Sequence, residues 1–364
     1  MSGRVRLYFF LSLLFVYFLF VSFLASFLPD PVDLHNLSDR DHSPSFLSSA
    51  DLPYVDLSYK GEFGFELTTL LPYAYHLWST GALRSTLGCG IMSSYYYFSP
   101  NHTDRFECHR SYGDSKVVQS DHGFPMWWGA WADSEWSRWR PPPLRAEYQN
   151  RPLPPGWPTS LDWRALALRP LVVIHNKHTT EWSHAPINTI DLPCLARLLE
   201  LLSPRFTVLY SRVVLNKTSG GDDQPAWPFE DHAFVREWAL NNTAPGSVLV
   251  LQDLPGEMNL AQISANSRST RFISIQGGPM VLPTYFGGAH IVLHREGREL
   301  RANAYESSFP RLGGAMITTV LTCDEMCERA SGIFVEPFVA MMQHRDSYLN
   351  DRVLEKDGTA PTKS

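Results

Sequence analysis

Strand-like and helix-like patterns alternate along the second half of the chain. Short runs of β-branched and other apolar residues predict strands buried on both faces at 171–175, 206–210, 247–251, 271–275 and 289–293. Between these runs, apolar residues recur at helical spacing, which predicts helices at 192–202, 234–240, 256–267 and 280–286. The alternation predicts a parallel sheet with crossover helices, a fold in which ligands bind at the carboxyl ends of the strands.

Two glycine pairs, Gly277-Gly278 and Gly287-Gly288, flank one of these predicted helices. The first pair follows a predicted strand and precedes Pro279, which suits the first turn of a helix, and the second pair ends that helix. A glycine turn of this kind exposes backbone N–H groups, which favours a phosphate or another anion. The alternative is a crossover whose glycines only permit close packing. The position at the end of a strand favours the phosphate interpretation.

The pattern in the first half of the chain is less regular. Residues 66–83 predict a helix that is interrupted or kinked at Pro72, preceded by the sequence GEFGFE. Prolines crowd residues 141–158, which predicts a linker without helix or central strand. We therefore expect two lobes, at 54–140 and 159–348, and a disordered polar tail at 349–364.

The longest apolar stretch lies at the N-terminus. Leu7 to Leu28 carry no charge and no proline, and a helix of this length spans the roughly 30 Å core of a bilayer. Arg4 and Arg6 precede the stretch, which predicts a cytosolic tail at 1–6 and a luminal remainder. A cleaved signal peptide is the alternative, although the run is long for one. Residues 29–53 are polar and aperiodic, and they predict a flexible stem.

The composition is that of a folded protein of the secretory pathway. Apolar residues make up 44% of the chain and charged residues 19%, which excludes an intrinsically disordered protein. The net charge of -6 contains no long basic block, so no nucleic acid is expected as a partner. N-glycosylation sequons begin at Asn36, Asn101, Asn216 and Asn241. We expect a single-pass type II protein of the Golgi or endoplasmic reticulum membrane, attached through residues 7–28.

Five cysteines allow up to two disulfides. Cys89 with Cys108 would close a modest loop and Cys323 with Cys327 a tight one, which leaves Cys194 as the odd thiol. No Cys/His spacing resembles a zinc site, so no thiolate metal site is expected.

The motifs of several enzyme classes are absent, and one resemblance stands out. The chain lacks the dinucleotide fingerprint, the P-loop and the Gly-x-Ser-x-Gly elbow of serine hydrolases. The strand, glycine turn and short helix of 271–286 resemble the nucleotide-binding turn of GT-B glycosyltransferases, and GGPMVLPTYFG is similar to a segment of bacterial heptosyltransferases. The type II anchor and layout resemble eukaryotic glycosyltransferase family 61. The resemblance implies an α/β fold with two Rossmann-like lobes, a nucleotide-sugar donor and a glycan or glycoprotein acceptor.

Glycosyl transfer requires a cradle for two phosphates, and the turn after the fourth predicted strand supplies candidates. These residues are Gln276, Gly277, Gly278 and Pro279. Lys177 and Arg212, each just beyond a predicted strand, are candidates to neutralise the phosphates, and such cations would make a divalent metal unnecessary. The alternative is that both are ordinary solvated cations.

Polar residues elsewhere supply further candidates. His175, His178, Glu181 and His184 follow a predicted strand, and we expect His178 and Glu181 to line the donor site. Asp222-Asp223 is not the spaced Asp-x-Asp of metal-dependent glycosyltransferases, and it is interpreted as a solvated turn. No metal or cofactor is expected besides the donor itself.

The transfer also requires a base for the acceptor hydroxyl. Glu62 is the first candidate, because Glu66 is better explained by the first turn of its helix. Asp121 and His122 are the second choice. Five tryptophans at 124–140 suggest a sugar-stacking platform, although core packing explains most of them. A non-catalytic luminal glycan-binding or scaffold protein with the same fold is the alternative function.

Overall fold

The structure, a computed structural model, describes residues 54–105, 139–180, 186–212, 224–225, 229–297, 299–300 and 303–339. The described residues belong to one compact unit. The predicted cytosolic tail, membrane anchor, stem and C-terminal tail lie outside the described residues. In the part of the chain that is described, no helix is long and apolar enough to cross a membrane.

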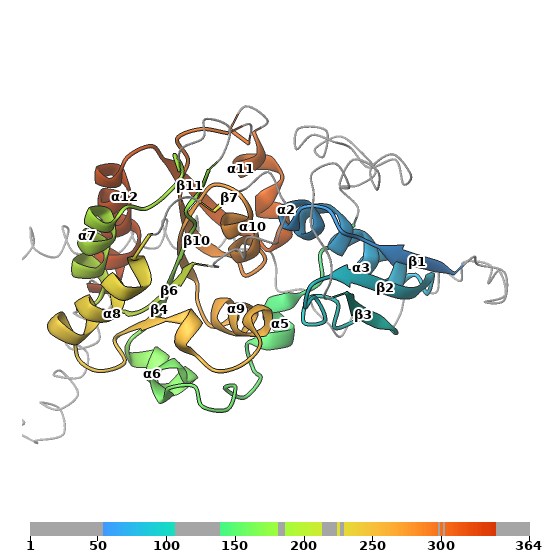
Figure 1. Cartoon of the computed structure of the whole chain (residues 1–364), viewed down its shortest axis with the longest axis horizontal. Helices are drawn as coiled ribbons and strands as arrows, with labels where there is room; N and C mark the ends of the chain where they lie inside the picture. Colours follow the sequence, from blue (N-terminus) through green and yellow to red (C-terminus); the bar gives the residue numbers. More distant parts are fainter. Residues whose placement is uncertain are drawn as a thin grey trace, which may run out of the picture. The chain divides into compact units, whose positions relative to one another are not determined.

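Six parallel strands form the larger sheet (Figure 1). The strands are β4 (Leu171–Asn176), β6 (Thr207–Arg212), β8 (Val248–Val250), β9 (Arg271–Ile275), β10 (Gly288–Leu293) and β11 (Ala315–Val320). Their order is β11-β10-β9-β4-β6-β8, which places the first strand, β4, in the centre. The chain adds β6 and β8 on one side of β4 and then crosses over to add β9, β10 and β11 on the other side, with all strands parallel. This is the strand order of a Rossmann fold, and the reversal is its topological switch point. The predicted parallel α/β sheet is confirmed.

Helices cover both faces of this sheet. One face carries α7 (Leu192–Leu202), α8 (Asp231–Asn242) and α12 (Cys323–Ala330), and the other carries α9 (Met258–Ser267), α10 (Gly278–Thr284) and α11 (Ala304–Ser307) (Figure 1). Successive residues of β4 alternate between these layers, since Val172 packs in the core beneath α7 while Val173 packs in the core beneath α10. Polar side chains cap the start of three of these helices: Asp191 caps α7, Glu257 caps α9 and Thr322 caps α12.

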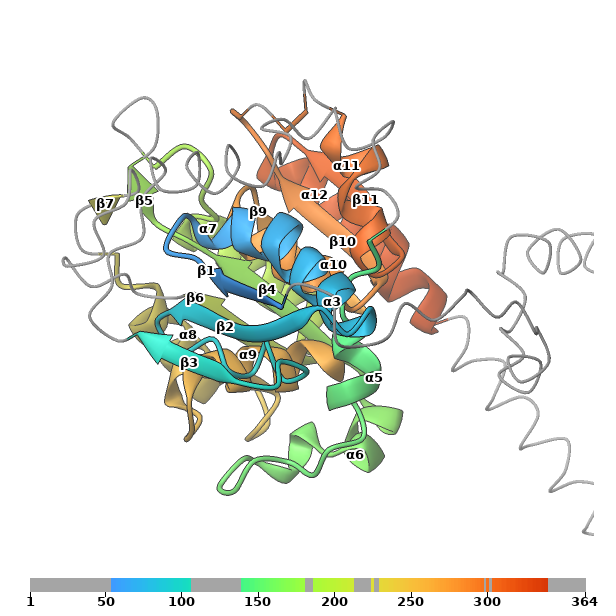
Figure 2. The same cartoon turned by 90° about the vertical axis from the view of Figure 1, so that its right-hand side faces the viewer.

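A smaller sheet is built from the first half of the chain. Its strands β1 (Val55–Ser58), β2 (Leu83–Cys89) and β3 (His102–Arg105) are parallel and lie in sequence order (Figure 2). We expected a full Rossmann-like lobe here, and the described residues contain these three strands. Between β1 and β2 the chain forms α2 (Phe63–Phe65), a π-helical turn η2 (Glu66–Leu70) and α3 (Leu71–Ser79). Pro72 falls in the first turn of α3, which continues directly from η2, so the π-helical turn immediately precedes the proline, which cannot donate a backbone hydrogen bond.

The proline-rich segment 141–158 contains a helix, α5 (Leu144–Tyr148), contrary to our expectation. The prolines lie before and after this helix and none lies inside it, so the helix can form. Arg145 fixes the helix to the larger sheet's layer by donating hydrogen bonds to the carbonyl oxygens of Ser267, Ser269 and Phe286. The segment is therefore ordered and is attached to the larger sheet's helical layer through Arg145. The expected lobe boundaries stay predictions.

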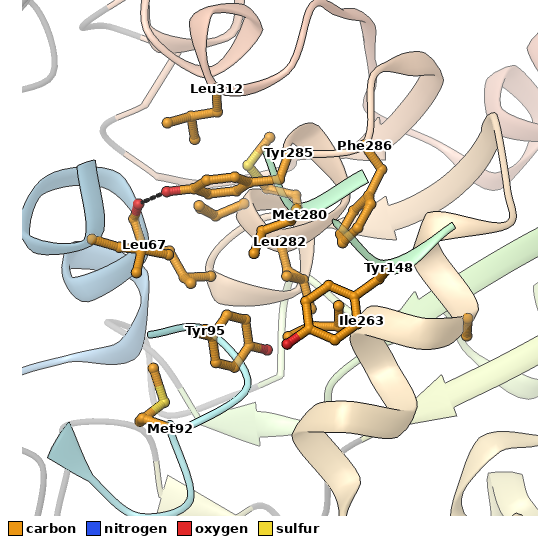
Figure 3. Packing of buried hydrophobic residues seen from close by; sticks show 14 of the residues in the cluster. Leu67, Met92, Tyr95, Tyr148, Ile263, Met280, Leu282, Tyr285, Phe286 and Leu312 are labelled. Atoms are coloured by element: carbon orange, nitrogen blue, oxygen red, sulfur yellow. Dashed lines mark hydrogen bonds between the residues drawn. The ribbon is translucent and has the colours of Figure 1, made fainter. Parts of the chain in front are cut away.

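Helix α10 lies between the two sheets. It contacts β4, β9 and β10 on one side, and α2 and η2 on the other. Tyr285, which follows α10, donates a hydrogen bond through its hydroxyl to the Leu67 carbonyl oxygen of η2 (Figure 3). Leu67, Tyr95, Met280 and Phe286 belong to one continuous buried cluster. The glycine turn at the start of α10 therefore lies where the two halves of the unit meet.

The disulfide pairing differs from the predicted one. Cys194 of α7 is bonded to Cys323 of α12, with a Cα–Cα distance of 5.7 Å, and Cys327 is a free thiol whose Sγ lies 4.0 Å from that of Cys323. The prediction of a Cys323–Cys327 bond was wrong because both residues share one helix, while the neighbouring helix presents Cys194. Cys89 is also disulfide-bonded, and Cys108 lies outside the described residues.

Candidate functional site

The carboxyl ends of three adjacent strands bring polar residues to the switch point of the larger sheet. Lys177 follows β4, Gln276 and Gly277 follow β9, and His294 follows β10. Because parallel strands end at the same edge, these residues gather although the sequence separates them widely. This edge is the candidate site.

Gly277 forms the turn between β9 and α10. Its backbone has φ 97° and ψ -158°, a conformation that L side chains rarely adopt. A Cβ placed on this glycine would lie 2.8 Å from Nζ of Lys177. Gly277, Gly278 and Pro279 are each half-buried, so the main chain of the turn is partly open. The sequence thus places bare backbone directly against an ammonium group.

Lys177 is held at this position by a buried polar network. Asn176 accepts hydrogen bonds from the backbone N–H groups of Lys177 and Ile190, both at 3.0 Å. Thr189 donates its hydroxyl to the Lys177 carbonyl oxygen at 2.8 Å. Only 9% of the Lys177 surface is exposed. A fixed, largely desolvated ammonium beside an open turn is suited to attract an anion.

The loop that follows β10 is connected to the same turn through side chains. Asn188 donates to Oε1 of Gln276 at 3.3 Å and to the Glu296 carbonyl oxygen at 2.7 Å, and it accepts from the Arg295 N–H at 2.8 Å. Gln276 in turn donates through Nε2 to Oε1 of Glu299. These bonds fix the position of the loop relative to the glycine turn.

His294 is fully buried beside this loop. Its Nδ1 shares a hydrogen bond with the hydroxyl of Tyr305. Burial lowers the pKa of His294, against the opposing charge of Glu299 and a backbone hydrogen bond with Gly297, and Lys177 lowers it further. Burial also raises the pKa of Tyr305 well above its usual value. The neutral forms of both groups are therefore favoured.

The first half of the chain reaches the glycine turn through Phe63. The position of a Cβ on Gly278 would be 3.6 Å from Cδ1 of Phe63, which is ordinary van der Waals contact. Glu62 immediately precedes Phe63 and is half-buried, so the first candidate base is close along the chain to the turn. Glu66, by contrast, is fully buried and accepts a 3.0 Å hydrogen bond from the hydroxyl of Tyr96. Glu66 is built into the core.

Arg212, the second cation predicted to face the donor phosphates, is paired with an internal carboxylate. Its guanidinium binds both carboxylate oxygens of Asp231 at 2.6 Å, and it also donates to the Phe229 carbonyl oxygen at 3.0 Å. Asp231, at the start of α8, is fully buried and also accepts from the hydroxyl of Tyr210. Arg212 therefore neutralises an internal carboxylate, and its role toward a donor phosphate stays a prediction.

The histidines after β4 also differ in their surroundings. His175 is buried within the sheet, where it bonds Asn266 at 2.9 Å, and burial lowers its pKa to about 4. It belongs to the core, because it is the last but one residue of a strand covered on both faces. His178 stacks on Phe229 with ring centroids 4.3 Å apart, and burial lowers its pKa. Contact between His178 and a donor stays a prediction.

Several candidates cannot be placed. Asp121, His122 and Glu181 lie outside the described residues, as do His184, Asp222-Asp223 and four of the five clustered tryptophans. The fifth, Trp139, packs on Tyr73 with centroids 4.5 Å apart. In the part of the chain that the structure describes, no three His, Cys, Asp or Glu side chains are grouped so as to hold a metal ion.

Some residues of the site were missed in the sequence. His294 follows the predicted strand at 289–293 directly, and the rule that ligands bind at strand ends would have selected it. Asn188 and Glu299 lie within loops and do not directly follow a predicted strand, so no local pattern pointed to them.

Comparison with known proteins finds weak structural likeness. No family model and no curated protein sequence matches the chain. The structure is similar to that of the E. coli ADP-heptose LPS heptosyltransferase II, with a TM-score of 0.44 and 9% identity over 78% of this chain and 99% of that chain. It is similar to a glycosyl transferase family 9 protein from Veillonella parvula, with a TM-score of 0.43 and 9% identity over 80% of this chain and 93% of that one.

A UDP-GlcNAc 2-epimerase from Neisseria meningitidis, bound to UDP-GlcNAc, is also similar, with a TM-score of 0.37 and 11% identity over 79% of this chain and 92% of that one. Likenesses at these scores do not assign the chain to a family.

Proposed function

We propose that the chain is a glycosyltransferase that moves a sugar from a nucleotide-sugar donor to a glycan or glycoprotein acceptor. The observation that carries the proposal is the contact between the Gly277 turn and Nζ of Lys177 at the switch point of a Rossmann-ordered sheet. Open main chain, a fixed cation and the carboxyl ends of the strands coincide there. A diphosphate has the charge and the acceptor oxygens that match this arrangement.

In the proposed reaction each residue of the site has a separate role. The acceptor hydroxyl attacks the anomeric carbon of the donor sugar while the bond from that carbon to the phosphate oxygen breaks. Lys177 and the N–H groups of the turn stabilise the negative charge that develops on the departing diphosphate. Glu62 is the proposed base that takes the proton from the hydroxyl. In this scheme Lys177 supplies the positive charge that a divalent metal would otherwise bring.

The proposal includes the cellular setting. Residues 7–28 would act as an uncleaved type II anchor in the Golgi or endoplasmic reticulum membrane, with the described unit in the lumen. The competing function is a luminal glycan-binding or scaffold protein. Transfer or hydrolysis of a sugar from UDP, GDP or ADP sugars by the purified full chain separates the two, because a scaffold would bind a glycan without turnover.

The Gly277→Val substitution tests the proposal directly. A valine at this position would bring its side chain against Lys177 and the open turn, so we expect no detectable binding of any nucleotide or nucleotide sugar. Binding is measured by calorimetry on the full chain in detergent micelles. Gly81→Val is the matched control, since Gly81 has a similar φ of 75° and no atom within 4 Å of the added Cβ. Unchanged affinity in Gly277→Val would refute the phosphate site.

A further inference from the structure

Two of the four N-glycosylation sequons lie in the described part of the chain, and both of their asparagines are exposed. Asn101 precedes β3, and its sequon ends at Thr103 on that strand. Asn241 lies in the last turn of α8, and its sequon ends at Thr243, directly after the helix. An N-linked glycan is bulky and requires a surface position. The folded chain offers such a position at both asparagines.

The hydrogen bonds at the two positions are compatible with an attached sugar. Nδ2 of Asn101 donates to the Arg84 carbonyl oxygen at 3.3 Å. A glycosylated amide keeps one N–H, so this bond can persist. The side chain of Asn241 forms no hydrogen bond among the described residues, whereas that of Asn242 donates to the Trp238 carbonyl oxygen at 2.9 Å. Attachment of a sugar at either position therefore breaks no described contact.

Asn101 lies at the edge of the smaller sheet that is remote from the candidate site. The three strands of this sheet are parallel, so their carboxyl ends share one edge and their amino ends share the other. The chain that leaves the carboxyl end of β1 reaches Phe63, which lies beside Gly278 of the glycine turn. Asn101 precedes the amino end of β3, so a glycan there would extend away from the turn.

Asn241 is likewise remote from the site in the larger sheet. Helix α8 begins at Asp231, which binds Arg212 at the carboxyl end of β6. From there the helix extends about 18 Å, at about 1.5 Å per residue. It then leads into β8, which is parallel to β6, so its last turn lies at the amino ends of these strands. A glycan on Asn241 would therefore leave Lys177 uncovered.

The strand that follows Asn101 gives the first glycan a physical role. Among the described residues β3 is the last strand of the smaller sheet and pairs with β2 alone (Figure 2). Thr103 is exposed on this strand. The outer backbone groups of an edge strand can pair with a strand of another chain, which leads to aggregation. A hydrophilic glycan at the start of β3 would hinder the approach of a second chain.

We propose that Asn101 and Asn241 carry N-linked glycans, and that the glycan on Asn101 protects the edge of β3 from pairing with a second copy of the chain. In this modification Nδ2 attacks C1 of a lipid-linked diphosphate oligosaccharide. The bond from nitrogen to C1 forms, the bond from C1 to the phosphate oxygen breaks, Nδ2 loses one proton, and the lipid diphosphate departs. The inference rests on the luminal setting in the proposed function.

Mass spectrometry of the full chain, expressed in eukaryotic cells, tests the two sites. Peptide-N-glycosidase removes each N-glycan and converts the asparagine that carried it to aspartate, which marks the occupied positions. We expect both positions to be marked in the wild type, and one glycan to be lost in Asn101→Gln and in Asn241→Gln. Asn242→Gln is the matched control and should keep both glycans, because Asn242 begins no sequon.

Three variants of Thr103 test the protection of the edge. Thr103→Ala and Thr103→Lys both destroy the sequon, but only lysine adds a charge that discourages pairing between edges. In size-exclusion chromatography of the full chain in detergent micelles, we expect Thr103→Ala to form larger species and Thr103→Lys to elute like the wild type. Thr103→Ser keeps the sequon and should also elute like the wild type. Thermal unfolding of each variant checks that the fold is retained.

Enzymatic removal of the glycans from the folded wild type repeats the comparison without a substitution. We expect larger species to form, as in Thr103→Ala. Nucleotide affinity should stay unchanged, because both glycans lie away from the site. A change in affinity would show that a glycan reaches the site, which contradicts the placement.

The outcomes distinguish the inference from the proposed function. An empty Asn101 or Asn241, in a chain that carries a glycan on Asn36 or Asn216, would overturn the inference and leave the luminal setting intact. If none of the four sequons carries a glycan, the luminal setting itself is refuted, while sugar transfer is still judged by its own assay. A Thr103→Ala variant that elutes like Thr103→Lys would overturn the protective role.

Discussion

Lys177 and Arg212 are cations at the carboxyl ends of neighbouring strands, and the structure uses them differently. Lys177 follows β4 and presents Nζ to the Gly277 turn. Arg212 ends β6 and is held by both oxygens of a buried carboxylate. In the sequence the two looked equivalent. The deciding difference is Asp231, which α8 places over the end of β6.

The comparison shows that the helix that follows a strand determines what the strand-end cation contacts, since α8 brings Asp231 to Arg212 while α10 begins at the glycine turn beside Lys177. The Arg212–Asp231 ion pair belongs to a hydrogen-bond network: Tyr210 donates its hydroxyl to Asp231, and Asn176 donates to that hydroxyl at 3.0 Å. The same Asn176 fixes the backbone of Lys177. The end of β6, with Arg212 and Asp231, is thus an internal ion pair that we call the support side. The end of β4, with Lys177 and the Gly277 turn, is the candidate binding side.

The largest effect on stability is expected from removing the negative charge of Asp231. In Asp231→Asn the guanidinium of Arg212 stays buried without its counter-charge, which should lower the free energy of unfolding by about 3–5 kcal/mol. Urea unfolding measures this. Asp253→Asn is the matched control, because Asp253 pairs with Arg236 at an exposed position and should cost less than about 1 kcal/mol. Equal losses would show that Asp231 is not a special support.

A second pair of variants separates binding from stability. Lys177→Met should weaken pyrophosphate and nucleotide binding about 10- to 100-fold, since it removes one charge-assisted contact, with little change in the urea midpoint. Arg212→Met should do the opposite and lower the midpoint while leaving the affinity of the folded protein unchanged. If both substitutions weaken binding equally, Arg212 belongs to the binding side and the comparison fails.

A third and smaller effect concerns pH, because a buried histidine, His175, lies in β4, the strand that Lys177 follows. The pKa of His175 is about 4 in the folded protein, below its ordinary value of 6.5, owing to burial. As the pH falls below 6.5 the unfolded chain takes up a proton that the folded chain does not, so stability is lost by about 1.4 kcal/mol per pH unit until the pH nears 4.

Burial and the nearby His175 also lower the pKa of His290, to about 3, which adds a second contribution of the same sign. Urea midpoints at pH 7 and pH 5 measure the slope, and His175→Gln should reduce it. A slope that does not change in His175→Gln would show that another group is responsible.

The larger sheet could be predicted from sequence because its strands are continuous apolar runs separated by helical periodicity. Five of its strands were predicted close to their observed bounds, and β11 was missed, since its pattern mixes exposed and buried residues. The strands of the smaller sheet were missed for the same reason: β1 and β3 are short and half exposed. A strand forms a continuous apolar run in the sequence only where both of its faces are covered.

The site was predictable where it depends on local backbone and not where it depends on distant partners. The Gly277 turn could be recognised because glycine, proline and a strand end are adjacent in sequence. The pairing of Arg212 with Asp231, and of Cys194 with Cys323, could not, because each depends on how separate helices pack. Asn188 contacts Gln276 across 88 residues of sequence, and no spacing rule encodes such a contact.

The Cys194–Cys323 bond also bears on synthesis of the chain. The two residues are 129 positions apart, and the ring that they close contains β6, β8, β9, β10 and β11. A ring of this size removes about 5 kcal/mol of chain entropy from the denatured state. The bond can form only after nearly the whole sheet has left the ribosome. Until then Cys194 is an unpaired thiol, and once Cys323 emerges, Cys327 competes for it from the next turn of the same helix.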